Sequence, residues 1–240
     1  MEYRLGEDPS RLPLAGVDSA VHCAWDLKAT TWDEIAATNV QGSIALLQAA
    51  QAAGVRRIIF ISSMSAYAGC RSMYGRAKCL VEAETLKLGL AIRPGLVWAE
   101  KTGGIVGAME GVICRSPIVP LIGSGNYLQY PAHCDDVAEF IFQASQLEPL
   151  PSVPLSAASA QPLTFRGLLQ ALATRAGKKP LFLPPPWTLL YAGLPHGRGA
   201  PPAPAVSERQ LARSRVSQSP AGLHPATRNG RRVPPFCLRA

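Results

Sequence analysis

The stretch that decides the fold is Ile58-Ile-Phe-Ile-Ser-Ser-Met-Ser-Ala-Tyr-Ala-Gly-Cys-Arg-Ser-Met-Tyr-Gly-Arg-Ala-Lys78. Its β-branched apolar run ends in Ser62 and Ser63, as expected for a strand that is covered on both faces of a parallel sheet. Tyr74 opens a helical pattern, and Lys78, four positions later, lies on the same helix face. A hydroxyl, a phenol and an ammonium group in one place form a site for proton transfer.

Strands and helices alternate on both sides of this stretch. We expect strands over 17–23, 57–62 and 91–97, and helices over 31–53 and 72–88, with a Pro-Gly break inside the third strand. This order predicts βαβ units, a parallel sheet and right-handed crossovers. The predicted fold class is therefore α/β, a partial doubly wound sheet, and ligands are expected beyond the carboxyl ends of its strands.

The alternation of strand and helix patterns is weaker after residue 100. It predicts helices over 103–114, 135–146 and 164–176, and short extended segments over 118–122 and 128–133. Residues 147–162 are rich in Pro and Ser and are predicted to connect to a small lobe. We therefore expect a first domain over 1–146, a small C-terminal, substrate-side lobe over 147–196, and a disordered basic tail over 197–240.

Most of the net charge of +8 lies in that tail. From Gly197 onward, eight arginines against one acidic residue give +7, which leaves +1 for residues 1–196. The tail lacks interleaved aromatic residues, which argues against nucleic-acid binding by base stacking. An inert tail, a partner-binding arm and translation in a shifted reading frame all remain open interpretations.

The composition is that of a globular protein, with 48% hydrophobic and 17% charged residues. No apolar run approaches the roughly 20 residues of a membrane span, and the N-terminus has no apolar signal-peptide core. We expect a cytoplasmic protein without membrane contact. The six cysteines are scattered and form no Cys-x-x-Cys pair, so no metal site is predicted.

Taken together, the motifs resemble the extended short-chain dehydrogenase/reductase family, of the NAD-dependent epimerase/dehydratase type. The segments that carry the resemblance are Val17-Asp-Ser-Ala-Val-His-Cys-Ala24, Asn39-Val-Gln-Gly42, Phe60-Ile-Ser-Ser-Met-Ser-Ala-Tyr67, Tyr74-Gly-Arg-Ala-Lys78, Arg93-Pro-Gly-Leu-Val97 and Pro131-Ala-His-Cys-Asp-Asp-Val137. The resemblance covers roughly residues 1–190 and implies a Rossmann-like fold, a small polar substrate and NAD or NADP as cofactor. It also implies a homodimer formed through a pair of helices.

The resemblance assigns roles to individual residues. Tyr74 would be the catalytic acid and base, Lys78 would lower its pKa and hold the nicotinamide ribose, and Ser63 would orient the substrate oxygen. An adjacent ammonium group is indeed expected to pull the phenol pKa down from near 10. The residues implied to contact the cofactor are Ala24, Trp25, Asn39, Ile61, Ser62, Tyr74, Lys78, Pro94, Gly95, Leu96 and Val97.

Each of these residues also has a purely structural interpretation. The serines could simply end a strand, and Tyr74 and Lys78 could be a packing aromatic and a solvated lysine. Asn39 could be an amide on a helix surface. His22, inside a strand, is interpreted as structural, and His133 as a loop histidine with its hydrogen bonds satisfied.

The sequence departs from the family pattern in two ways. The family begins with a strand and a Gly-x-x-Gly-x-x-Gly turn that binds the pyrophosphate, whereas only Gly6 and Gly16 occur before Val17. We therefore expect a chain truncated at its N-terminus that binds NAD(P) poorly or not at all, and a non-catalytic remnant or interaction protein is the alternative hypothesis. The loop between Ser63 and Tyr74 is also short for a sugar-nucleotide epimerase, which leaves the substrate open.

Overall fold

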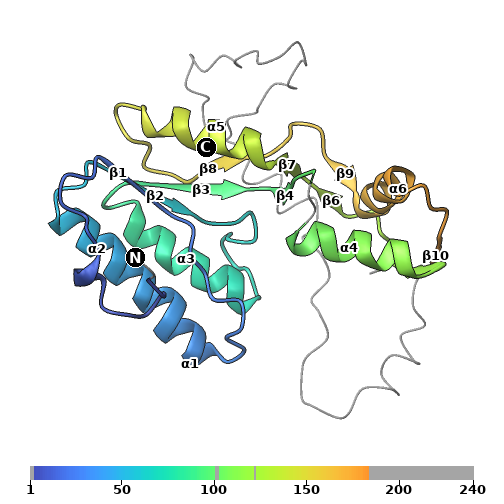
Figure 1. Ribbon diagram of the computed structural model, residues 1–240, viewed down its shortest axis with the longest axis horizontal. Helices are drawn as coiled ribbons and strands as arrows, with labels where there is room; N and C mark the ends of the chain where they lie inside the picture. Colours follow the sequence, from blue (N-terminus) through green and yellow to red (C-terminus); the bar gives the residue numbers. More distant parts are fainter. Residues whose placement is uncertain (1–2, 101–102, 122, 184–240) are drawn as a thin grey trace. The chain divides into compact units, whose positions relative to one another are not determined.

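The computed structural model describes residues 3–100, 103–121 and 123–183 (Figure 1). The elements in chain order are η1 (Pro9–Arg11), β1 (Ser19–His22), α1 (Trp32–Glu34), the π-helical segment η2 (Ile35–Gln41), α2 (Gly42–Ala52), β2 (Arg57–Ile61), α3 (Met73–Thr85), β3 (Leu90–Pro94), β4 (Leu96–Trp98), α4 (Gly104–Arg115), β5 (Ile118–Pro120), β6 (Leu128–Gln129), β7 (Pro131–His133), α5 (Cys134–Ser145), β8 (Leu155–Ala157), β9 (Leu163–Thr164), α6 (Phe165–Arg175) and β10 (Leu181–Leu183). They form two compact units, described in turn below.

The first unit contains a four-stranded sheet in the order β1-β2-β3-β8, and all neighbouring strands are parallel. Helices α2 and α3 cover one face of this sheet and α5 covers the other (Figure 1). The predicted α/β fold with a wound parallel sheet is confirmed. Residues 147–162, predicted as a connection, also contain the fourth strand, because Leu155 pairs with Ile92 of β3.

Side chains alternate between the two faces of β2. Ile58 and Phe60 pack with α2 and α3, whereas Ile59 packs with Phe140 and Ala144 of α5. All three β2 side chains are at most 2% exposed. A strand that buries both of its faces has no polar alternation, which explains the continuous apolar run in the sequence.

Side-chain caps fix the starts of the two helices that shape the site. Thr31 and Glu34 form a capping box at α1, which continues through η2 into α2. At α3, the Ser72 hydroxyl accepts a hydrogen bond from the Gly75 backbone N–H at 3.0 Å. The predicted helices over 31–53 and 72–88 are thus present, and Tyr74 lies in the first turn of α3.

Gly89, between α3 and β3, allows the backbone to pass directly against β2. A Cβ atom at this position would lie 2.0 Å from the carbonyl oxygen of Ile58. We expect Gly89→Ala to lower the free energy of unfolding by about 1–3 kcal/mol, since backbone has to shift to relieve the overlap. Urea unfolding followed by circular dichroism measures this loss.

Gly111→Ala is the matched control for that substitution. The added Cβ would meet only the flexible end of Arg115, in the middle of α4. Because alanine favours a helix over glycine by up to about 1 kcal/mol, we expect this variant to be as stable as the original or slightly more stable. Equal unfolding curves for Gly89→Ala and the original chain would contradict the close approach at β2.

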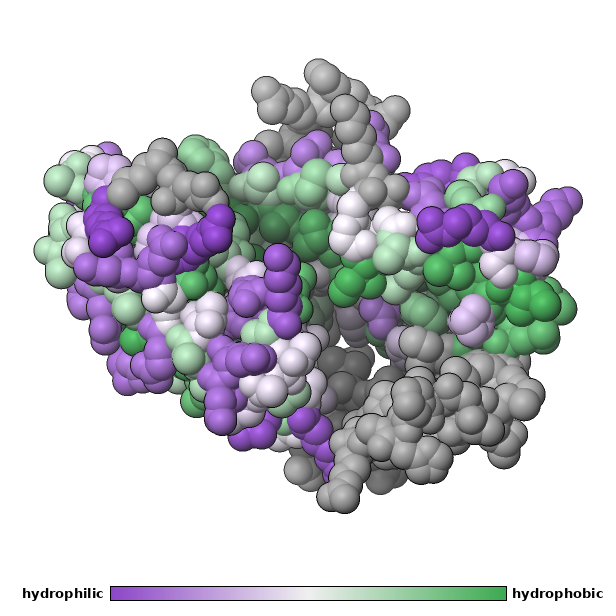
Figure 2. All heavy atoms as spheres, turned by 60° about the horizontal axis from the view of Figure 1, so that its bottom comes forward, coloured by the Kyte–Doolittle hydropathy of each residue, from purple (hydrophilic) through white to green (hydrophobic). Residues whose placement is uncertain are grey.

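The second unit contains residues 96–135 and 159–183 among those described. Its strands form three two-stranded sheets, β4 with β7, β5 with β10 and β6 with β9. Buried side chains of α4 and α6, such as Ile113 and Leu169, form its core. Figure 2 shows apolar side chains on the surface of this unit, and those exposed are Val97, Ile105, Val112, Ile118, Leu163, Leu181 and Leu183.

The compact units do not follow the boundary predicted at residue 146. Residues 96–135 belong to the second unit, and residues 147–158 belong to the first because β8 completes its sheet. The predicted strand over 91–97 is also divided, since β3 ends at Pro94 and β4 pairs with β7 in the second unit. The predicted tail over 197–240 lies outside the described residues. Within the described part of the chain, no helix is long and apolar enough to cross a membrane.

Candidate active site

The candidate site lies where the carboxyl end of β2 meets the first two turns of α3. Tyr74 and Lys78 project from one face of α3, and Ser62 and Ser63 directly follow β2. The loop after β1, which carries Trp25, completes the group, because the Trp25 ring contacts Tyr74 edge-on at 5.8 Å between ring centroids. The sequence prediction that these side chains meet at a strand end agrees with this geometry.

Lys78 is buried and held from two directions. Its Nζ donates a hydrogen bond to the carbonyl oxygen of Ile61 at 2.8 Å, and only 3% of the residue is exposed. The same nitrogen lies 3.8 Å from the ring centroid of Trp25 and 4.6 Å from that of Phe60. Both rings present their faces to the ammonium group, an arrangement that stabilises a cation.

Burial lowers the pKa of Lys78 to about 7, and Cys23 and Glu82 act in the opposite direction. Near neutral pH the side chain is therefore close to its midpoint of protonation. A lysine with this pKa can change its charge during a reaction, which an exposed lysine does not do at the same pH.

Tyr74 is 36% exposed, so part of its side chain is accessible to solvent. Burial raises the pKa of Tyr74, and a hydrogen bond with Ser63 acts in the opposite direction. Lys78 Nζ lies 5.8 Å from the centroid of the Tyr74 ring. The predicted lowering of the Tyr74 pKa by Lys78 is therefore wrong for this arrangement, because partial desolvation of the phenol outweighs the other influences.

The two serines after β2 differ in their surroundings. Ser63 is half-buried, and its hydroxyl oxygen accepts a hydrogen bond from the Ser65 backbone N–H at 3.1 Å. Ser62 is 4% exposed, and its backbone N–H donates to Ile92 at 2.7 Å. Among the described residues, the Ser62 hydroxyl is the one buried side-chain oxygen without a hydrogen-bond partner. A buried hydroxyl of this kind is suited to a polar ligand.

Asn39 positions the loop that carries Ala24 and Trp25. Its side-chain oxygen accepts from the Asp26 backbone N–H at 2.7 Å, and its side-chain nitrogen donates to the Asp26 carbonyl at 2.9 Å. Asn39 is fully buried. It is therefore not the helix-surface amide of the structural interpretation, and the sequence offered no sign of its partner, which is backbone.

His22 has a structural role, as the sequence analysis proposed. Its Nε2 lies 2.8 Å from the Ser43 hydroxyl oxygen, and the ring packs against Phe60. Burial lowers the pKa of His22 to about 4, and the positive charge of Lys78 adds to this effect. His22 is therefore neutral at pH 7 and adds no positive charge near Lys78.

Gly75 is a site residue that the sequence analysis did not single out. A Cβ atom here would lie 2.3 Å from the Ser65 carbonyl oxygen and 2.9 Å from the Ser72 hydroxyl oxygen. The lack of a side chain therefore allows the loop after Ser63 to pass close to Tyr74. One signal in the sequence could have identified it. A glycine in the first turn of a predicted helix is unusual, because most other residues make a helix more stable.

The predicted contacts from residues 94–97 divide between the two units. Pro94 is the last residue of β3 and Gly95 follows it, and the Pro94 carbonyl accepts from the backbone N–H of Met64, the residue after Ser63, at 3.4 Å. Leu96 and Val97 lie in β4 of the second unit, paired with Pro131 and Ala132. Ser62, Tyr74, Lys78 and the loop at Trp25, in contrast, all belong to the first unit.

Residues 12–87 match the sequence model of the NAD dependent epimerase/dehydratase family. The matched segment contains every residue of the Ser63–Tyr74–Lys78 group. The resemblance stated from the motifs is therefore confirmed over this segment. None of the curated proteins matches the chain in sequence.

Solved structures with a similar fold include several enzymes. UDP-glucose 4-epimerase of Thermotoga maritima, solved with UDP-glucose, is 21% identical, with a TM-score of 0.65 over 77% of this chain and 71% of its own. RMD of Pseudomonas aeruginosa, complexed with NADPH, is 20% identical, with a TM-score of 0.63 over 77% and 76%. A double mutant of DesIV, a dTDP-glucose 4,6-dehydratase from Streptomyces venezuelae with NAD bound, is 20% identical, with a TM-score of 0.61 over 76% and 66%. At these identities the likeness establishes the fold.

Proposed function

We propose that this chain carries the catalytic group of an NAD(P)-dependent epimerase, dehydratase or reductase, made of Ser63, Tyr74 and Lys78. The observation that carries the proposal is the meeting of three groups at the carboxyl end of β2. An accessible phenol is hydrogen-bonded to Ser63, and a buried lysine with a pKa of about 7 lies one helical turn away. The match of residues 12–87 to the epimerase/dehydratase family supports the same chemistry.

Each residue has a defined task in this proposal. The Tyr74 hydroxyl takes the proton from a substrate hydroxyl, or returns one to a carbonyl, and Ser63 orients that oxygen through its own hydrogen bond. Lys78 stabilises the phenolate when it is protonated. Bound NAD(P) would accept or supply a hydride at the same carbon atom. Ser62, Lys78, Ala24 and Trp25 would hold its nicotinamide end.

A sugar nucleotide is the substrate class to test first. The similar solved structures include proteins bound to UDP-glucose and named for UDP-glucose and dTDP-glucose chemistry. The loop between Ser63 and Tyr74, which contacts the substrate side of the group, is short, so a smaller hydroxyl or carbonyl compound is the second class to test.

A second candidate function is a non-catalytic interaction protein. One observation favours it. The indole of Trp25 lies directly on the Lys78 ammonium group, where a ribose would have to bind.

Titration of the 240-residue chain with NADH and NADPH, followed by cofactor fluorescence, separates the two candidates. We expect NAD(P) binding that depends on Lys78, whose buried ammonium group lies at the proposed nicotinamide end. Lys78→Met should weaken this binding at least about tenfold, equivalent to about 1.4 kcal/mol. Lys87→Met, which removes an exposed lysine paired with Glu84, is the matched control and should bind as the original does.

The outcomes differ clearly. Micromolar binding that depends on Lys78 would exclude the non-catalytic candidate. The absence of binding up to millimolar cofactor would remove the enzyme proposal for this chain and leave the interaction protein.

A further inference from the structure

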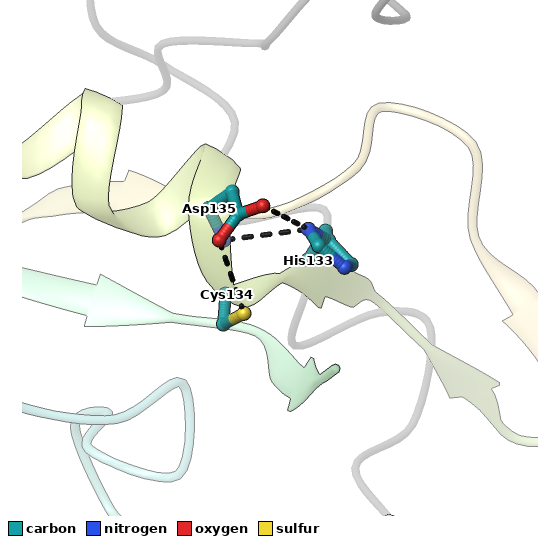
Figure 3. Close-up of side chains that lie close together, drawn as sticks. All are labelled: His133, Cys134 and Asp135. Atoms are coloured by element: carbon teal, nitrogen blue, oxygen red, sulfur yellow. Dashed lines mark hydrogen bonds and ion pairs between the residues drawn. The ribbon is translucent and has the colours of Figure 1, made fainter. Parts of the chain in front are cut away.

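Three consecutive side chains with metal-binding atoms converge where β7 ends and α5 begins. They are His133, Cys134 and Asp135, all in the second unit (Figure 3). One donor atom from each, the imidazole nitrogen, the thiol sulfur and a carboxylate oxygen, lies within 4.8 Å of the other two. Among the described residues, no other group of three His, Cys, Asp or Glu side chains comes this close.

The backbone holds these side chains together. His133 is the last residue of β7, paired with Trp98 of β4, and the Trp98 ring contacts the imidazole edge-on at 4.6 Å. The chain then turns directly into α5, which brings the next two side chains to the same side as the histidine (Figure 3). The imidazole is therefore fixed by a strand and an aromatic ring, and not by a freely moving loop.

The Asp135 carboxylate is the centre of the group. One of its oxygens lies 3.8 Å from His133 Nδ1, and the other accepts a hydrogen bond from the Cys134 thiol at 3.5 Å. The Asp135 backbone N–H donates to His133 Nδ1 at 3.3 Å, so this nitrogen carries a lone pair and no proton, and a metal ion bound there would take the place of this hydrogen bond. Both neighbouring side chains thus already point toward the acidic one, as the dashed lines in Figure 3 show.

These separations are close to those that a tetrahedral metal site requires. Zinc bonds of about 2.0–2.3 Å to nitrogen, oxygen and sulfur imply distances of roughly 3.3–3.8 Å between ligand atoms. Small rotations of the exposed Asp135 side chain would complete the convergence. A thiolate and an imidazole favour zinc, cobalt or copper over magnesium or calcium, which prefer oxygen ligands alone.

We propose that His133, Cys134 and Asp135 bind one divalent transition-metal ion of the zinc class, with the fourth position open to water. On binding, the thiol releases its proton to solvent and a metal–sulfur bond forms, with no change of oxidation state. The cluster shares no residue with the Ser63–Tyr74–Lys78 group. Metal binding here is therefore an additional proposal, and it can be tested independently of the proposed function.

Titration of the full chain with Co²⁺ alone tests the proposal, because a cobalt–thiolate bond gives a charge-transfer band in the near ultraviolet. We expect this band to saturate at one ion per chain and to disappear when Zn²⁺ is added. Cys134→Ser should abolish it, and His133→Gln or Asp135→Asn should weaken cobalt affinity at least about tenfold. Cys114→Ser, at an exposed cysteine of α4 in the same unit, is the matched control and should retain the band.

Two results would overturn the proposal. One is a chain that shows no thiolate band up to millimolar Co²⁺ while its circular dichroism is that of a folded protein. The other is a band of full intensity in Cys134→Ser, which would place the ion on another cysteine. Because none of these measurements uses NAD(P) or a substrate, failure of the proposed enzyme function cannot be mistaken for failure of the metal site.

Discussion

Replacement of Tyr74 by Phe is expected to lower turnover at least about a hundredfold while leaving the fold intact, because only the proton-transferring oxygen is removed. The phenyl ring retains its edge contact with Trp25. Since Tyr74 is partly exposed, loss of its hydroxyl group should change the free energy of unfolding by no more than about 1 kcal/mol. Loss of turnover without loss of stability is the result that separates chemistry from packing.

The measurement is product formation by the full chain with NAD⁺ and a sugar nucleotide such as UDP-glucose, with circular dichroism recorded on the same samples. Tyr127→Phe is the matched control, because Tyr127 stacks on Phe165 in the second unit and the substitution preserves that stacking. Ser63→Ala should also lower turnover, by removing the hydrogen bond to Tyr74. Unchanged turnover in Tyr74→Phe would remove this residue from the mechanism.

The parts of the site that could be predicted are those fixed by local rules. The apolar run of β2 predicts a strand covered on both faces, and Ser72 marks the start of α3. Gly89, which was expected to end that helix, lies beyond its last residue, Thr85, and directly before β3. Spacing by four places Tyr74 and Lys78 on one helix face. These features depend on residues a few positions apart, so sequence alone was sufficient.

Features that depend on distant contacts could not be predicted. The strand β8 is three residues long within a Pro- and Ser-rich segment, and it is a strand because β3 lies beside it. The two hydrogen bonds of Asn39 go to the backbone of Asp26, thirteen residues away. Nothing in the local pattern of either segment indicates these partners.

The direction of the Tyr74 pKa shift shows the same limit. The spacing alone suggests that a lysine four residues away lowers the pKa of Tyr74. Spacing gives no information, however, about how far each side chain is shielded from water. Lys78 is instead turned toward Ile61 and covered by Trp25, and burial acts on both residues. Desolvation raises the pKa of a phenol and lowers that of a lysine, so the two pKa values, which are 10.0 and 10.5 in water, move apart. Burial thus favours the neutral form of both side chains.

Replacement of Lys78 by Met is expected to remove activity and, at the same time, to stabilise the fold at pH 7. The reason is the pKa of about 7, which lies well below the 10.5 of a solvated lysine. Keeping this charged side chain out of water opposes folding, and the cost is largest at and below about pH 7 and fades as the pH rises toward 10.5. A methionine fills similar space without charge, so we expect a gain of about 1–3 kcal/mol in the free energy of unfolding at pH 7, after loss of the hydrogen bond to Ile61.

The pH dependence of that gain identifies its cause. Between about pH 7 and 10.5 the unfolded state of the original chain binds more protons at this lysine than the folded state does, so its stability rises with pH in this range. Lys78→Met lacks this contribution, and its advantage should therefore shrink steadily as urea unfolding is repeated from pH 7 to pH 10. Lys87→Met, at an exposed lysine, should differ from the original by less than about 0.5 kcal/mol at every pH. A Lys78→Met chain that is less stable at pH 7 would mean that the buried ammonium group stabilises the fold. A stability difference that does not change with pH would mean that folding does not lower the pKa of Lys78, and burial at this lysine would then not be the source of its reactivity.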